Sequence, residues 1–269
     1  MNRRLYLRDF RSVGSLNFDG ATNRLSDFPF FFGNNFEYDT TDKFTFSFWI
    51  YPRSVSTRQA LFNRWDWVSV TEYKGYYLDL RSDGKLEFVF LPNLSQTIKV
   101  ESSIALTVNK WQHVCVTHDG LNTSSAKPKI YIESVDVSTL YNYVGTPIGS
   151  VLTGNTPWQF GARENGPTGS SLSFFYNGLL DELTAWSGEF SSDDVKEIWN
   201  GGTPMDPQLH SRCSVLDSWF PFIDDLIDLS GLHWFQNYAG IDGGLNGYNN
   251  FALLGVSFNN DDNSVDIPG

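Results

Sequence analysis

The residues best suited to catalysis are three closely spaced carboxylates, Glu37, Asp39 and Asp42. Paired carboxylates can act as nucleophile and general acid on a glycosidic bond, provided that a rigid element holds them on either side of it. These three lie in a turn-rich segment before an alternating strand predicted at 44–50. We therefore expect them to form a solvated loop, and we predict no catalytic residues in this chain.

A second group with suitable chemistry is His113, Cys115 and His118, whose side chains are all zinc ligands. The segment 111–117 alternates as a strand, so His113 and Cys115 share one face while His118 lies on the other. A zinc site needs three or four ligands that converge. A structural role for these histidines is therefore the better interpretation.

Aromatic side chains beside polar ones form a third kind of site, because a sugar ring can stack on an exposed aromatic platform. The chain has nine Trp and twelve Tyr, more than its predicted strands need. We predict a ligand-binding set at loop and strand-end positions, formed by Trp65, Trp67, Tyr73, Trp158, Arg163 and Asn165. The alternative is that these aromatics fill a large core and a subunit interface.

The elements that would position these groups are short strands. Alternating apolar residues and turn signals such as Asp83-Gly84 predict strands at 15–20, 44–50, 76–80, 85–90, 111–117, 129–132, 158–161 and 178–183. One helix is expected near 192–199, capped by Ser191 or Ser192 and ended by Gly201. Short strands with one late helix indicate an all-β, two-sheet antiparallel sandwich.

Charge is unevenly distributed along the chain, which carries −12 overall. Residues 203–269 hold nine Asp and one Arg, whereas residues 1–11 contain Arg3, Arg4, Arg8 and Arg11 against one Asp. This predicts a basic N-terminal arm (1–11), a main domain (12–202) and an acidic C-terminal extension (203–269). The four arginines are predicted to dock neighbouring subunits, with ordinary solvated surface as the alternative. The acid excess argues against nucleic-acid binding.

Cysteine content and hydropathy exclude other classes. The two cysteines, Cys115 and Cys213, are expected to be free thiols rather than a disulfide framework. No apolar run long enough for an export signal or a membrane span is present, so we expect no membrane insertion.

The ordered fragments at 18–20, 44–50, 83–86, 111–120, 161–163 and 178–183 resemble laminin G-like, concanavalin A-like lectin/glucanase domains, over roughly residues 12–202. The resemblance implies a jelly-roll with curved sheets. One departure is visible, since Glu133 to Asp136 stands where the family often has an Asp-Gly or Asn-Gly hairpin. Laminarinase-type members carry a catalytic Glu-x-Asp-x-x-Glu run on a strand, whereas the acidic run here ends in Asp42 and lies outside a strand.

The resemblance also implies that no cofactor is required but that a structural calcium ion is compatible with the fold, with Asp19 and Asp181 as its ligands. The alternative is that Asp19 serves its own turn and Asp181 makes a buried hydrogen bond.

Within the extension, the segments 216–222 and 228–231 and the closing 266–268 resemble the C-terminal regions of laminin G-like proteins from phage and marine viral particles. This implies a non-enzymatic virion structural or decoration protein, assembled in the host cytoplasm, released by lysis and associated with other virion subunits as a homo-oligomer. Binding to a host-surface glycan is compatible with that role. The alternatives are a secreted carbohydrate-binding or adhesion module and, with less support, a glycoside hydrolase or polysaccharide lyase.

Overall fold

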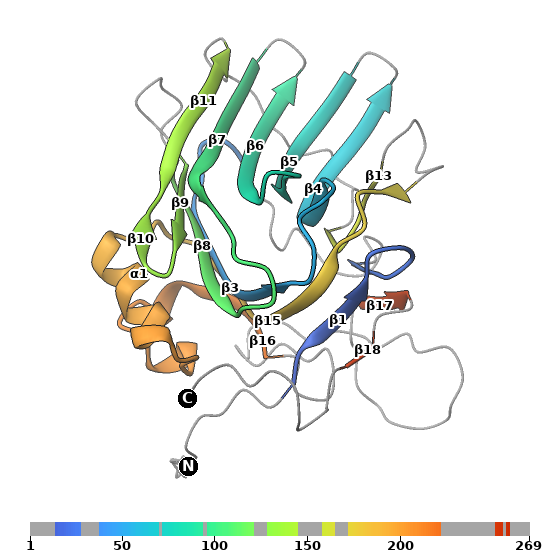
Figure 1. Cartoon of the computed structure of the whole chain (residues 1–269). Helices are drawn as coiled ribbons and strands as arrows, with labels where there is room; N and C mark the ends of the chain where they lie inside the picture. The colour runs from blue at the N-terminus through green and yellow to red at the C-terminus, as the bar shows by residue number, and fades with distance from the viewer. Residues whose placement is uncertain are drawn as a thin grey trace, which may run out of the picture.

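The computed structural model describes residues 14–27, 38–69, 72–93, 96–120, 128–144, 158–164, 172–221, 251–254 and 257–258. Two antiparallel sheets face each other, and Figure 1 shows β11, β7, β6, β5 and β4 side by side as one layer. The predicted all-β sandwich with one short helix is confirmed.

The first sheet, sheet 1, has the order β10-β9-β8-β3-β15-β1-β18, and β16 also pairs with β15. Its strands are β1 (Leu16–Asp19), β3 (Lys43–Pro52), β8 (Gln112–Asp119), β9 (Lys129–Ile132), β10 (Val135–Asp136), β15 (Asn177–Trp186), β16 (Leu216–Phe220) and β18 (Ser257–Phe258).

The second sheet, sheet 2, has the order β11-β7-β6-β5-β4-β12-β2-β17. Its strands are β2 (Arg24–Asp27), β4 (Gln59–Ser69), β5 (Glu72–Leu80), β6 (Lys85–Asn93), β7 (Gln96–Ala105), β11 (Ser138–Val144), β12 (Gln159–Phe160) and β17 (Phe251–Leu254). A separate pair joins β13 (Arg163–Glu164) to β14 (Leu172–Ser173).

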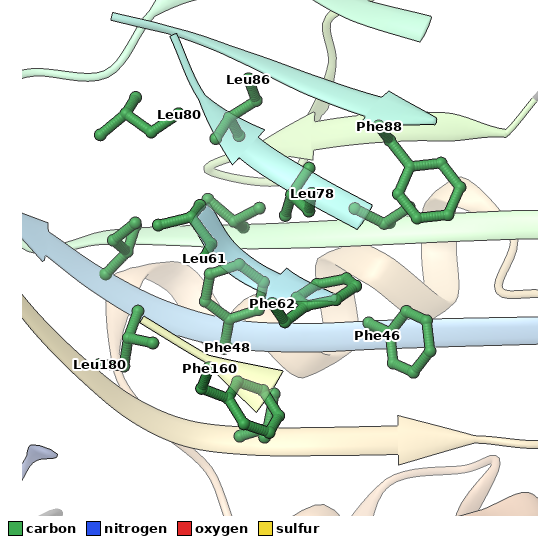
Figure 2. Close-up of a cluster of buried hydrophobic side chains, with 14 of the residues drawn as sticks. Phe46, Phe48, Leu61, Phe62, Leu78, Leu80, Leu86, Phe88, Phe160 and Leu180 are labelled. Carbon is green, nitrogen blue, oxygen red and sulfur yellow. The ribbon is translucent and has the colours of Figure 1, made fainter. Parts of the chain in front are cut away.

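The core forms between the sheets because alternate residues of each strand point inward. Figure 2 shows Phe46 and Phe48 of β3 close to Phe62 of β4, with side chains of β5, β6, β12 and β15 around them. The opposite face of β3 is also buried, since Trp199 of the helix and the segment that precedes the helix pack on it. There Thr45 donates to the Gly188 carbonyl and Ser47 bonds to His113.

The helix α1 (Ser192–Trp199) lies beside β9 and β10 in Figure 1. Ser191 is its N-cap, in a capping box with Asp194, as residue types at this end predict. Val195 and Ile198 are its buried residues. The helix ends at Asn200, which adopts a left-handed conformation one residue before the predicted Gly201.

The turn from β9 to β10 keeps the family's two-residue hairpin without glycine. Glu133 and Ser134 have φ of 52° and 63°, so both occupy the left-handed region that such turns require. The Glu133 carboxylate offsets that cost with two hydrogen bonds, accepting from the His113 amide at 3.0 Å and the Trp199 indole at 2.8 Å. This contact also ties α1 to the hairpin.

The predicted C-terminal extension contributes strands to both sheets. β16 pairs with β15, β17 pairs with β2, and β18 pairs with β1. The basic arm at 1–11, with Arg3, Arg4, Arg8 and Arg11, lies outside the described residues.

Candidate functional site

The core between the sheets is closely packed where the structure describes it. A gap of about 10 Å³ lies between Phe48, Phe62 and Leu180, whose side chains Figure 2 shows. A space of that size holds at most one water molecule. This part of the core therefore has no room for a ligand.

An open cleft lies at the rim where the two sheets meet. It has a volume of about 370 Å³ and is lined by Gly20, Thr57, Arg58, Ser173, Phe174 and Phe175. Three separate parts of the chain build it: the turn after β1, the residues before β4, and the link from β14 to β15. We call this the rim cleft.

Backbone hydrogen bonds hold the three walls of the rim cleft together. The Gly20 amide donates to the Tyr176 carbonyl at 2.8 Å, and the Ala60 amide donates to the Phe174 carbonyl at 2.7 Å. The Gln59 side chain accepts from the Asn177 amide at 2.8 Å. The cleft is therefore a preformed feature of the fold, since each wall is tied to a strand.

The first wall is a turn organised by Asp19. One of its carboxylate oxygens accepts from the amides of Ala21, Thr22 and Asn23, and the other accepts from the Thr22 hydroxyl. Slight burial would raise the pKa of Asp19, but these hydrogen bonds outweigh it and hold the pKa well below its ordinary value. Asp19 thus shapes the wall that Gly20 contributes.

Phe174 is the strained residue of the cleft. Its φ of 60° is an outlier for a bulky side chain, and such strain clusters at functional sites. The Arg163 guanidinium lies 5.0 Å from the centre of its ring and 4.0 Å from that of Tyr77. Arg163 therefore fixes the Phe174 ring from behind, while Phe174 itself lines the cleft.

Arg163 is in turn held by a buried carboxylate. Its Nη2 lies 3.0 Å from Oδ2 of Asp79, which is fully buried and also accepts from Arg58 Nη1 at 2.8 Å. Burial, opposed only in part by Arg163 and Arg58, raises the pKa of Tyr77 to about 12. Its phenol therefore stays neutral at physiological pH.

Arg58 joins the rim cleft to the charged outer face of sheet 2. Its Nη1 contacts Glu87 Oε1 at 2.8 Å as well as Asp79. Burial alone would raise the pKa of Glu87. The hydrogen bond from Arg58 and the charges of Arg58 and Lys99 outweigh burial and lower that pKa. The same carboxylates raise the pKa of Arg58 despite its partial burial, so the pair stays ionised.

The predicted ligand-binding set divides in the structure. Arg163 lies directly behind the rim cleft, but it is 8% exposed and positions Phe174. Trp158 is not on the rim, and that expectation is wrong. It is 3% exposed, because β12 turns its ring into the core against Phe46 and Phe62.

The other members of that set lie elsewhere. Trp65, Trp67 and Tyr73 belong to β4 and β5, where Trp67 pairs with Tyr73 across the two strands. Asn165 lies outside the described residues. Strand pairing therefore brings two of these aromatic positions together, away from the residues that line the rim cleft.

The two predicted calcium ligands do not share a site. Asp19 pairs with Asn177 in the ladder between β1 and β15, and Asp181 lies four residues further along β15, roughly 13 Å away. Asp181 is buried and accepts a hydrogen bond from the Glu182 amide. Both carboxylates thus serve the local backbone, and the described residues contain no group of three or more ligating side chains.

The remaining candidates have structural surroundings. Asp39 and Asp42 form the turn before β3, as predicted, and Glu37 lies outside the described residues. His113 faces Ser47, whereas His118 packs on the core side against Phe44. Cys115 and Cys213 are both free, which confirms the expectation.

The sequence pattern did not indicate five of the residues that line the cleft, Thr57, Arg58, Ser173, Phe174 and Phe175. The signal that could have found the two aromatics is the run Phe174-Phe175-Tyr176 before an Asn-Gly pair. Only alternate side chains of an extended segment can enter the core, so a run of three aromatics leaves at least one outside. Arg58 carries no comparable signal, since its role depends on β5 and β6.

Comparisons with known proteins agree with this architecture. A model of the Concanavalin A-like lectin/glucanases superfamily matches residues 13–196. A search of curated protein sequences finds no match. In the described part of the chain, no helix has the length and apolar character needed to cross a membrane.

Solved structures show the same fold at low sequence identity. A candidate carbohydrate-binding protein from Bacteroides ovatus is 15% identical with a TM-score of 0.57, over 96% of this chain and 63% of that one. The CBM40 of a Ruminococcus gnavus IT-sialidase, bound to α2,3-sialyllactose, is 10% identical with a TM-score of 0.50, over 70% and 99%.

A heptameric SAP-like pentraxin from Limulus polyphemus is 17% identical with a TM-score of 0.48, over 72% of this chain and 85% of that one. At these identities, the structural likeness concerns the fold alone. The family match covers most of the described sandwich, from three residues before β1 to the middle of α1. The chain therefore belongs to the Concanavalin A-like lectin/glucanases superfamily.

Proposed function

We propose that this protein is a non-catalytic carbohydrate-binding module and that the rim cleft is its binding site. The observation that carries the proposal is the composition of the cleft, in which two half-buried phenylalanines lie beside a guanidinium and two hydroxyl groups. Aromatic rings offer a stacking surface to the apolar face of a sugar, and the polar groups can bond its hydroxyls. Solved carbohydrate-binding proteins with this fold agree with the proposal at the level of architecture.

The carboxylates near the cleft support binding rather than hydrolysis. Glycosidases place two carboxylates on either side of the scissile bond. None of the residues that line the rim cleft is acidic. Asp79 and Glu87, which lie behind it, are buried and paired with Arg58, so neither is placed to attack a sugar or to donate a proton to it.

The first experiment is to screen the full chain and a Phe174→Ala variant on a glycan array, then titrate the best glycan. We expect the variant to bind about tenfold more weakly, the loss of roughly 1.4 kcal/mol expected for an aromatic anchor. The matched control is Val135→Ala, which shortens an exposed apolar side chain on β10 and should leave affinity unchanged.

Each outcome of the screen is informative. Full affinity in a folded Phe174→Ala variant would move the site away from the rim cleft. Binding to no glycan, or release of shorter saccharides during incubation, would contradict the proposed function itself. Far-ultraviolet circular dichroism and a thermal melt of both variants keep a loss of binding distinct from a loss of folding.

We also propose a setting for this activity, a subunit on the surface of a virus particle, present in several copies. Its support lies in the sequence, in the basic residues of 1–11 and the acidic residues of 203–269, which suit contacts between neighbouring subunits. Purified particles separated on a density gradient should contain the chain in a fixed ratio to the shell protein. Its recovery only in the soluble fraction would contradict this setting and leave carbohydrate binding in place.

A further inference from the structure

The outer face of sheet 2 next to the rim cleft has its charges arranged in two layers. The carboxylates lie underneath, with Asp79 and Glu87 side chains 0% and 2% exposed. The cations lie above them, since the side chains of Arg58, Arg81 and Lys99 are 30%, 27% and 22% exposed. Asp83 beside Arg81 is 44% exposed, so it is at Arg58 and Lys99, above Asp79 and Glu87, that an approaching molecule meets cations first.

The three cations converge on a single buried carboxylate. Glu87 Oε1 lies 2.8 Å from Arg58, and its Oε2 lies 3.1 Å from Lys99 and 4.0 Å from Arg81. The cationic groups therefore form one compact cluster rather than scattered surface charges. Since Arg58 also lines the rim cleft, the cluster continues directly from the cleft.

The charges of this face balance in number but differ in depth. Arg58, Lys99 and Arg163 surround the buried Asp79 and Glu87, whereas Arg81 is paired with Glu101 and Asp83. What distinguishes the part of the face next to the cleft is that its carboxylates are buried while Arg58 and Lys99 are partly exposed.

We propose that the saccharide bound at the rim cleft is acidic and that its carboxylate or sulfate groups lie against the cluster of Arg58, Lys99 and Arg81. This inference rests on the proposed function and names the class of its ligand. Both carboxylate contacts of Arg58 use Nη1, so Nε and Nη2 are not engaged by Asp79 or Glu87. A guanidinium offers paired N–H groups that match an anionic oxygen pair.

A saccharide fits these observations better than a nucleic acid does. The cleft is lined by two phenylalanines and has a volume of about 370 Å³. Both properties suit a few sugar units. Duplex DNA is stiff and carries a charge at every phosphate, so it would also meet the negative charge of the rest of the chain, whereas a flexible acidic saccharide can place a few of its units against the cluster.

The test compares matched acidic and neutral polysaccharides on the full chain by titration. Polygalacturonate is paired with its methyl ester, and dextran sulfate is paired with dextran. We expect at least one acidic form to bind about tenfold more tightly than its neutral twin. That difference should shrink several-fold in about 0.5 M NaCl, because salt screens exposed charges.

Two variants locate the effect. Lys99→Met keeps the aliphatic length of the side chain and leaves Glu87 paired with Arg58, so the protein should fold. It should weaken binding to the acidic form two- to fivefold and leave binding to the neutral twin unchanged. Lys196→Met removes an exposed cation from α1 and should change neither.

The outcomes separate this inference from the proposed function. Equal affinity for the acidic and neutral twins would overturn the acidic class and leave carbohydrate binding standing. Binding to none of the four polysaccharides would overturn the inference, while the glycan array decides the proposed function. Duplex DNA that binds as tightly as dextran sulfate would show a general polyanion surface and overturn the inference as well.

Discussion

Gly161→Ala is expected to lower the free energy of unfolding by about 2 to 4 kcal/mol. Gly161 has a φ of +76°, which costs an alanine roughly 1 kcal/mol. An added Cβ would also lie 2.2 Å from two carbons of the Phe18 ring. Phe18 is fully buried in β1, so it cannot move away without opening the core, and overpacking of this kind costs about 1 to 3 kcal/mol.

The matched control for this substitution is Gly201→Ala. Gly201 has a similar φ of +68°, but an added Cβ there meets nothing within 4 Å. It should therefore lose only the conformational part, about 1 kcal/mol. Urea unfolding of both variants measures the difference, and equal losses would contradict the packing of Phe18 against Gly161.

The same substitution should disturb the rim cleft. The Gly161 amide donates to the Leu61 carbonyl, and its own carbonyl accepts from Tyr176, the residue after Phe175. This turn connects β12 to β13, whose first residue is Arg163, and the Arg163 guanidinium lies over the Tyr77 ring. A change that shifts Gly161 therefore shifts both Arg163 and the aromatic wall of the cleft.

The second large effect is a loss of stability in mild acid that depends on His113. Burial lowers the pKa of His113 to about 3, whereas an unfolded histidine titrates near 6.5. Because the folded pKa is depressed, the contribution of His113 to stability is complete above pH 6.5 and is lost as the pH falls towards 3. Between neutral pH and pH 5, the stability lost through His113 should amount to about 2 kcal/mol.

The measurement is a set of urea unfolding curves at several pH values between 7.5 and 5, comparing the wild type with His113→Gln. The glutamine amide can still bond to Ser47, which lies 2.7 Å from His113 Nε2. As the pH falls below 6, the free energy of unfolding of the wild type should decrease more steeply than that of the variant. The difference in slope corresponds to one bound proton, roughly 1.4 kcal/mol per pH unit. Parallel curves would show that His113 titrates normally and is not buried in the neutral form.

The sandwich itself was predictable because its strands alternate so regularly. Phe44, Phe46, Phe48 and Ile50 repeat at every second position, so one face of β3 had to be buried. The same regularity correctly separated His113 from His118. The strands β4, β7 and β11, and short ones such as β2, were not predicted. In β4 the cause is visible, since its register shifts between Ala60 and Phe62 and interrupts the alternation.

The candidate site was less predictable, because it is made of tertiary contacts. Arg163 could be selected by its motif, but the side chain that it positions, Phe174, is eleven residues further along the chain. Arg58 acquires its role only when the pairing of β5 with β6 sets Asp79 opposite Glu87. Trp158 was placed on the rim because strand ends are often exposed, whereas β12 is a two-residue strand between β4 and β2 and is covered on both sides.

The central claim is that saccharide binds at the rim cleft, and the most direct measurement is a crystal structure of the full chain with the best glycan from the array. We predict a sugar ring stacked on Phe174 or Phe175, with an oxygen atom within hydrogen-bonding distance of Arg58. Density for the glycan over Trp67 and Tyr73, or at any place that leaves the rim cleft unoccupied, would contradict the claim.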